Sequence, residues 1–185
     1  MIEVIYTNRL VLRPYRIEDI DAIHYYASHE DIAKYTLWGP NTYEETVNFV
    51  NEIIHKFYQE NPVTHLEYAI DYDGKMIGGV SIHLHLDKNE GEMGWILNPD
   101  FHHLGIATEA AEALKQYVLK KYKLHRILAT CDARNKASVS VMMKLGMTKI
   151  KTDKNARKNK ETGIYEFDEL TYEVITSRQV MKHHV

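Results

Sequence analysis

Cysteine is nearly absent from the sequence, which holds Cys131 alone among 185 residues. A single cysteine excludes an internal disulfide and favours a reducing compartment. The sequence also lacks a secretory signal segment, an apolar run long enough to cross a bilayer and any Asn-X-Ser/Thr glycosylation site. These absences argue against a secreted or membrane-bound protein, so we expect a cytoplasmic chain with no membrane partner.

An excess of charge of one sign is lacking as well. Lys and Arg number 23 against 26 Asp and Glu, which gives a formal net charge of −3. This balance argues against nucleic acid as a partner and allows a mild preference for amine substrates. We find no internal repeat, low-complexity segment or linker, so the length predicts one domain, 1–185, that forms its core without disulfides.

Hydrophobic periodicity predicts the order of the elements. The Asp73-Gly74 pair predicts a hairpin turn, Thr42 with Glu45 predicts a helix capping box, and Gly146 predicts a helix end. Strands are expected at 7–15, 65–72, 76–86, 92–97, 125–132, 147–152 and 165–175, and helices at 17–28, after Thr42, at 108–122 and at 138–145; the polar segment 153–163 is expected to be a long basic loop.

This order predicts an α/β (α+β) fold. We expect a mixed, mostly antiparallel, twisted sheet of about seven strands with helices on both faces. The strand–helix–strand unit from 92 to 132 is expected to form a right-handed parallel crossover.

The most informative segment joins the strand at 92–97 to the helix at 108–122. It contains a Pro-containing turn and a short loop with Gly105 and Ala107. Small residues let the backbone approach a ligand, and the free N–H groups and the dipole of a helix start attract an anion. The sequence therefore predicts a diphosphate site. The phosphate-binding patterns of P-loop and dinucleotide-binding proteins are absent.

Several motifs along the chain resemble one family. Residues 102–107, His-His-Leu-Gly-Ile-Ala, look like the acyl-CoA loop of the GNAT N-acetyltransferases, whose pattern is Arg/Gln-x-x-Gly-x-Gly/Ala. The following Thr-Glu-Ala is similar to the branch that acetylates the N-termini of ribosomal proteins. Segments 7–14, 92–99 and 135–147 match the same branch. The resemblance implies the GNAT acyl-CoA N-acyltransferase fold and acetyl-CoA as cofactor.

The resemblance further implies direct acetyl transfer to a primary amine, either a protein N-terminus or a small molecule. His102 stands where Arg or Gln is usual, and either binds a phosphate or points to solvent; His103 is expected mainly in solvent. An N–H group within 96–98 is expected to polarise the thioester if its strand splays from the strand at 125–132. The implied coenzyme contacts are Ile96, Leu97, His102, His103, Leu104, Gly105, Ile106, Ala107, Thr108, Asn135, Ser138, Met142 and Lys144.

Glu92 is the candidate general base, because it begins an otherwise apolar strand and shares a face with Gly94 and Ile96. The alternative is an exposed glutamate beside a turn. Met142 occupies the position at which many relatives place a tyrosine that protonates the thiolate. The resemblance therefore implies that Ser138 takes this role.

Asn135 is expected to hold the pantetheine arm, to cap a helix, or both. Tyr35 and Trp38 are expected, with Glu92, on the acceptor side, although Trp38 could instead pack in the core.

Other interpretations are weighed against these. His83 and His85 share a strand face, but no third ligand has metal-site spacing, so no metal is expected. Cys131 is read as a core residue. A non-catalytic acyl-CoA sensor or interaction protein is the alternative from another class. A homodimer stays open, because no interface is readable.

Overall fold

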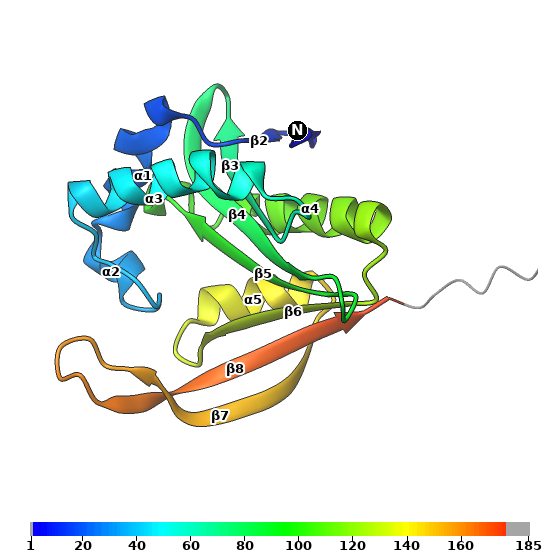
Figure 1. Cartoon of the computed structure of the whole chain (residues 1–185). Helices are drawn as coiled ribbons and strands as arrows, with labels where there is room; N and C mark the ends of the chain where they lie inside the picture. The colour runs from blue at the N-terminus through cyan, green and yellow to red at the C-terminus, as the bar shows by residue number, and fades with distance from the viewer. Residues whose placement is uncertain (1, 177–185) are drawn as a thin grey trace, which may run out of the picture.

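One twisted sheet of eight strands organises the protein, for which a computed structural model describes residues 2–176. Residue 1 and residues 177–185 of the expected domain lie outside the described residues. The strand order is β1-β2-β3-β4-β5-β6-β8-β7, and every neighbouring pair is antiparallel except β5 and β6 (Figure 1). The strands are β1 Ile5–Tyr6, β2 Leu10–Arg13, β3 His65–Tyr72, β4 Lys75–His85, β5 Glu90–Leu97, β6 Arg126–Asp132, β7 Thr148–Lys158 and β8 Tyr165–Ile175.

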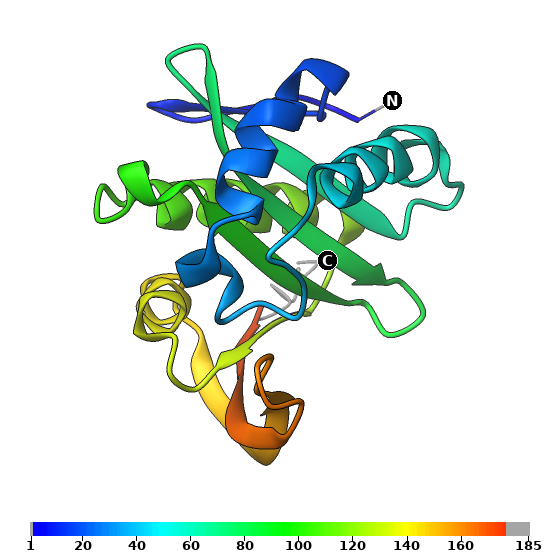
Figure 2. The same ribbon diagram turned by 90° about the vertical axis from the view of Figure 1, so that its left-hand side faces the viewer.

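Helices cover both faces of the sheet, as the sequence predicts (Figure 2). Helices α1 (Ile20–Ala27) and α3 (Tyr43–His55) pack on one face, and α4 (Ile106–Tyr122) and α5 (Lys136–Lys144) pack on the other. The short helix α2 (Glu30–Ala33) follows α1. Each face therefore has its own apolar core. None of the helices among the described residues combines the length and apolar character needed to cross a membrane.

The local signals of the sequence are confirmed. The Thr42 Oγ1 accepts a hydrogen bond from the Glu45 N–H at 3.2 Å, and the Glu45 carboxylate accepts one from the Thr42 N–H at 2.7 Å. Asp73 and Gly74 have φ values of 52° and 75°, and join β3 to β4 as a tight hairpin. Each signal acts through neighbours in the chain, which is why the sequence alone reveals it.

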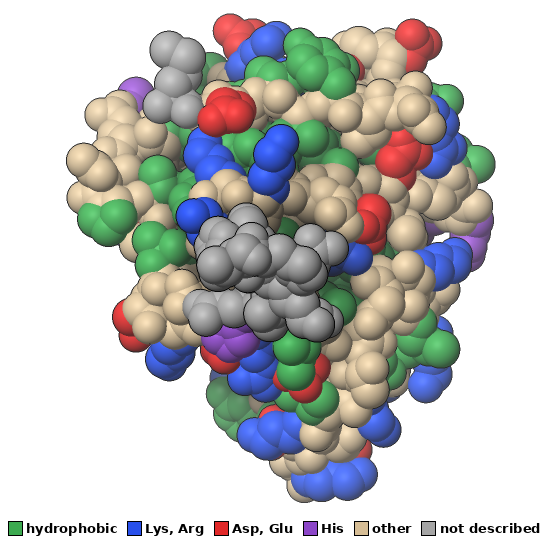
Figure 3. All heavy atoms as spheres, turned by 90° about the vertical axis from the view of Figure 1, so that its right-hand side faces the viewer, with side chains coloured by type: hydrophobic (Ala, Val, Ile, Leu, Met, Phe, Trp, Pro, Cys, Tyr) green, Lys and Arg blue, Asp and Glu red, His purple; other side chains and the backbone are tan. Residues whose placement is uncertain are grey.

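The segment 153–163 departs from expectation. Instead of a loop throughout, β7 continues to Lys158 and pairs with β8 through several register shifts. Such irregularities are common at sheet edges, where polar residues face solvent. Basic side chains gather at the lower end of Figure 3, over this part of the sheet. The strand β1 and the helix α2 were also missed, and eight strands replace the expected seven or so.

Candidate active site

A gap opens between β5 and β6 in the middle of the sheet. Parallel pairing joins only Glu90–Glu92 to Arg126–Leu128. Beyond these residues β5 continues to Leu97 and β6 to Asp132 without pairing to each other. The splay between these two strands that the sequence led us to expect is therefore present.

The polar groups that face this gap follow from the pairing of β5 with β4. The Asn98 N–H donates to the Ile77 carbonyl on β4 at 2.8 Å. Successive peptide groups of a strand face opposite sides. The N–H groups of Leu97 and Trp95 therefore point into the gap, whereas that of Ile96 points toward β4. Of the three expected residues 96–98, Leu97 is the one with an available N–H group.

The loop between β5 and α4 presents free amides at the end of the same gap. His103 and Gly105 adopt positive φ values of 62° and 75°, and Gly105 is the N-cap of α4. Within the described chain, the N–H groups of residues 103–108 donate to no protein acceptor. Consecutive free amides at a helix start form an anion-binding concavity. The free amides keep this loop as the candidate diphosphate site.

The N-terminal segment braces this loop. Arg9 Nη1 donates to the Leu104 carbonyl at 3.0 Å, and the Arg9 guanidinium pairs with the Glu109 carboxylate at 2.7 Å. The Thr7 hydroxyl donates to the same carboxylate at 2.6 Å. Burial alone would raise the pKa of Glu109, but these hydrogen bonds outweigh it and lower the pKa below its ordinary value. Arg9 thus offsets the negative charge of Glu109 at the start of α4.

His102 is engaged within the protein. Its Nε2 donates to the Leu97 carbonyl at 3.1 Å, which ties the loop to the end of β5. The ring is therefore held by a protein partner, and neither of the two sequence-based expectations describes this contact. His103 and Leu104 are exposed, Ile106 is buried, and Ala107 and Thr108 are half-buried.

The start of α5 lies at the end of β6. The Asn135 Oδ1 accepts a hydrogen bond from the Ser138 N–H at 3.0 Å, so Asn135 is a helix cap. Asn135 and Ser138 are half-buried and Lys144 is exposed. Met142, expected along the coenzyme, is instead 1% exposed and packs in the core between the sheet and its helices. This expectation needs correction, because the helical turn directs Met142 inward.

A cavity of about 410 Å³ lies on the opposite side of β5. Small residues on adjacent strands, Gly79, Ser81 and Gly94, form its floor, and residues of α1, α3 and the segment 36–41 complete its lining. The lining residues are Tyr15, Ile23, Tyr26, Ala27, Thr36, Trp38, Asn41, Phe49, His65, Glu67, Gly79, Ser81, His83, Gly94, Trp95 and Ile96.

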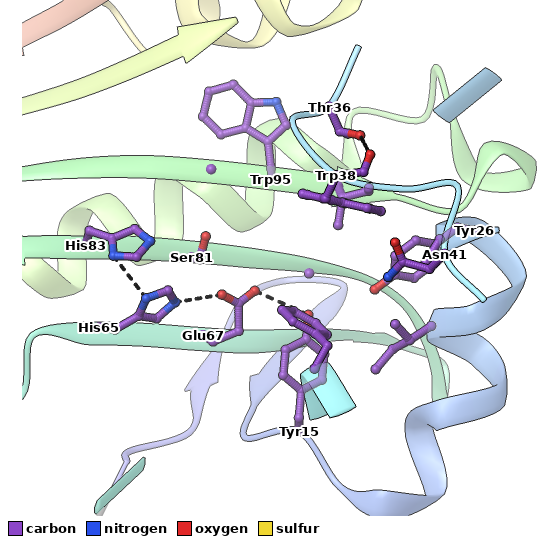
Figure 4. Close-up of a pocket in the computed structure, with 16 residues that line it drawn as sticks. Tyr15, Tyr26, Thr36, Trp38, Asn41, His65, Glu67, Ser81, His83 and Trp95 are labelled. Atoms are coloured by element: carbon purple, nitrogen blue, oxygen red, sulfur yellow. Dashed lines mark hydrogen bonds and ion pairs between the residues drawn. The ribbon is translucent and has the colours of Figure 1, made fainter. Parts of the chain in front are cut away.

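A buried carboxylate and two histidines form a hydrogen-bonded chain in this cavity (Figure 4). His65 Nε2 lies 2.8 Å from Glu67 Oε2, and His65 Nδ1 lies 3.1 Å from His83 Nδ1. The Tyr15 hydroxyl donates to Glu67 Oε1 at 3.4 Å. Glu67 is 9% exposed and His65 7% exposed, whereas His83 reaches solvent.

The residues expected on the acceptor side are separated by the structure. Trp38 lines the cavity, but Tyr35 does not and instead lies beside the Arg134 guanidinium. Glu92 also lies outside the lining. It sits opposite His83 on the neighbouring strand and accepts a hydrogen bond from Thr130 at 3.1 Å.

Lys160, in the turn between β7 and β8, fastens the segment that carries Trp38. Its ammonium donates to the carbonyl of Ala33 at 2.6 Å, to that of Gly39 at 2.9 Å and to that of Trp38. Burial lowers the pKa of Lys160. Lys160 therefore connects the turn between β7 and β8 to the segment that covers the cavity.

Glu67 and His65 were missed from the sequence. The sequence signal for them was that two polar residues stand at alternate positions of an otherwise apolar strand. Alternate positions place both side chains on one face of the sheet. Their relation to His83 depends on the register of β3 with β4, which pairs His65 with His83 and Glu67 with Ser81. Among the described residues, no group of three potential ligands is placed to hold a metal ion.

Known proteins share this architecture. Residues 9–148 match the acetyltransferase (GNAT) domain family. The uncharacterized N-acetyltransferase YnaD of Bacillus subtilis (strain 168) is 33% identical over 141 residues, which are 76% of this chain and 80% of that protein. A crystal structure of a GNAT-family acetyltransferase from Bacillus anthracis is similar, with a TM-score of 0.79 and 32% identity over 94% of this chain and 98% of that one.

A solved structure of the ribosomal L7/L12 alpha-N-protein acetyltransferase RimL with coenzyme A has a TM-score of 0.81. It is 20% identical and covers 94% of this chain and 98% of that chain. At this identity the likeness concerns the fold alone. The family match over residues 9–148 and the identity to YnaD agree with the splayed sheet, and the chain belongs to the GNAT family of acetyltransferases.

Proposed function

We propose that this protein transfers the acetyl group of acetyl-CoA to a small primary amine by direct attack in a ternary complex. The observation that carries the proposal is that two sites share one strand. Trp95 and Leu97 direct N–H groups into the gap beside β6, and Gly94, Trp95 and Ile96 line the cavity. A thioester in the gap and an amine in the cavity would meet at β5.

The part of the proposal that concerns acetyl-CoA rests on the gap between β5 and β6 and on the loop that precedes α4. The free amides of 103–108 bind the diphosphate, and the pantetheine arm runs along the gap as an added strand. The N–H group of Leu97 or Trp95 donates to the thioester carbonyl and stabilises the charge that develops on its oxygen. The capping bond of Asn135 uses only its carbonyl oxygen, which leaves the Nδ2 group for the pantetheine arm. We assign protonation of the thiolate to the Ser138 hydroxyl.

The part of the proposal that concerns the amine acceptor rests on the cavity. Glu67 is a carboxylate within a mostly aromatic and apolar lining, and an ammonium group beside it would gain both charge pairing and cation–π contact with Trp38 or Tyr15. The volume of about 410 Å³ is that of a small-molecule site. One carboxylate matches one cationic group, and the covering segment favours a compact amine over a protein N-terminus.

A turnover screen tests the proposal. Release of the CoA thiol is followed with small monoamines, polyamines, aminoglycosides and N-terminal peptides as acceptors. We expect small monoamines to give the highest kcat/KM, and Glu67→Gln to raise their KM by about tenfold or more, equivalent to the loss of a charge-assisted hydrogen bond. Calorimetry with CoA serves as the control, because this binding is expected to be unchanged.

Three results would overturn parts of the proposal. Peptides as the best acceptors would assign the protein to the N-terminal branch. A loss in Glu92→Gln that equals the loss in Glu67→Gln would return the central acceptor role to Glu92. CoA binding without turnover on any amine would identify a non-catalytic sensor.

A further inference from the structure

The hydrogen bonds that link Glu67, His65 and His83 have a definite donor-to-acceptor direction. The two histidines face each other across β3 and β4 through their Nδ1 atoms, which are 3.1 Å apart. Because two lone pairs cannot form a hydrogen bond, one Nδ1 must carry the proton and the other must accept it. The Glu67 contact with His65 Nε2, at 2.8 Å, decides which.

An ionised carboxylate only accepts hydrogen bonds, so His65 must carry its proton on Nε2. In the neutral ring this leaves a lone pair on His65 Nδ1. His83 must then donate from Nδ1, and its own Nε2 keeps a lone pair. Figure 4 shows this second ring nitrogen of His83 turned away from His65 on the cavity side. With His65 neutral, the hydrogen bonds therefore place a proton acceptor in the cavity wall.

We propose that His83 is the general base of the acetyl transfer and that Glu67 fixes its reactive tautomer through His65. This inference rests on the proposed function. An ammonium acceptor loses two protons as its nitrogen bonds to the acetyl carbon and the carbon–sulfur bond breaks. One proton restores the thiol of CoA. The other goes to His83 Nε2 and from there to water, since His83 is exposed to solvent while lining the cavity.

The surroundings of His83 suit a base that works near neutral pH. Burial of part of the ring is the largest cause that lowers the pKa of His83, and a positive charge on His65 would lower it further. Glu92 on β5 raises the pKa, His85 on the same strand as His83 lowers it, and Glu60, which precedes β3, has the smallest of these effects and raises it. The net pKa lies below its ordinary value, so the ring is neutral and its lone pair is available at pH 7.

His65 is a positioning residue. Its ring is 7% exposed and stacks on Phe57, with ring centroids 4.4 Å apart and an angle of 5° between the planes. Glu67 on one side and His83 on the other use both of its nitrogens. A rotation that would release the tautomer of His83 is therefore opposed by packing and by two hydrogen bonds.

Kinetics test the base directly. Turnover is measured from pH 5.5 to 9 for wild type, His83→Gln, His83→Asn and His65→Gln, with His85→Gln as matched control on the same strand. Two amines of different pKa are used. A fall in rate at low pH that is caused by protonation of the amine shifts with the pKa of the amine. A fall that is caused by protonation of His83, the acidic limb of the pH–rate profile, stays fixed. We expect His83→Gln and His83→Asn to lower kcat by about 10²–10⁴ and to remove the fixed acidic limb.

His65→Gln is expected to lower kcat less and to shift the fixed limb, and His85→Gln to change neither. Unaltered CoA binding by calorimetry shows that each variant is folded. Turnover that survives both His83 substitutions overturns the base role and leaves the proposed function standing. Absence of turnover by wild type on every amine overturns both.

Nitrogen NMR of the imidazole rings gives a test that needs no substrate. Wild type is expected to show His83 as the Nδ1–H tautomer with Nε2 unprotonated. Glu67→Gln can donate as well as accept, so it is expected to turn His83 into a mixture of tautomers. A His83 that carries its proton on Nε2 in wild type, or that is unaffected by Glu67→Gln, contradicts the inference.

Discussion

A methyl group added at Gly79 tests the floor of the acceptor cavity. A Cβ at this position would lie 2.1 Å from the Tyr15 hydroxyl oxygen and 3.4 Å from Tyr15 Cζ. The oxygen would have to move by about 1 Å to regain ordinary contact. Tyr15 is 4% exposed and has little room to move. We expect Gly79→Ala to lower the free energy of unfolding by about 1–3 kcal/mol, the usual cost of overpacking.

A double-mutant cycle makes this prediction specific. Tyr15→Phe removes the clashing oxygen and leaves the nearest remaining ring atom at 3.4 Å. Gly79→Ala should therefore cost under about 1 kcal/mol in the Tyr15→Phe background, which gives a coupling energy of about 1–2 kcal/mol. Urea unfolding of the four proteins measures it. Gly94→Ala is the control, since its Cβ meets only Ser81 Oγ, at 3.3 Å. Additive effects of the two substitutions would refute the close approach.

The remaining predictions concern the two ends of the site. Lys160→Gln removes the ammonium that binds the carbonyls of Ala33, Trp38 and Gly39. Because charge-assisted hydrogen bonds are lost at a partly exposed site, the KM for the amine should rise about three- to tenfold. The Kd for CoA should stay constant. Lys151→Gln is its control, because it breaks only an exposed ion pair with Asp153. An equal rise of the amine KM in both variants would contradict the role of Lys160 in positioning the segment that carries Trp38. Arg9→Gln leaves the Glu109 charge facing the diphosphate, so calorimetry should show CoA binding weakened by about 1 kcal/mol, with partial recovery in the double variant with Glu109→Gln. No recovery would mean that charge compensation is not the cause.

Elements set by neighbouring residues could be predicted from the sequence. The capping box at Thr42, the hairpin turn at Asp73 and the anion loop at Gly105 each follow from a few adjacent positions. The strand β7 could not be, because its charged residues are typical of a loop, and only pairing with β8 makes them an edge strand.

The acceptor site was harder to predict, because it depends on contacts between distant residues. Glu67 and His83 are brought together by the register of β3 with β4, which no local pattern fixes. His102 finds the Leu97 carbonyl only after the loop has folded back on β5. Met142 lies on the face of α5 that packs against the core, and this face is set by contacts with distant residues. Glu92 lies opposite His83 and outside the cavity lining, a relation that also depends on the register of two strands.

Calorimetry with three related ligands tests the central claim, that the amides of 103–108 hold the diphosphate of acetyl-CoA. CoA carries the diphosphate and a 3′-phosphate, dephospho-CoA lacks only the 3′-phosphate, and pantetheine lacks both. We predict that dephospho-CoA binds within about tenfold of CoA and that pantetheine binds more than about 100-fold more weakly, since several charge-assisted hydrogen bonds are lost. Pantetheine binding as tightly as CoA would contradict the account.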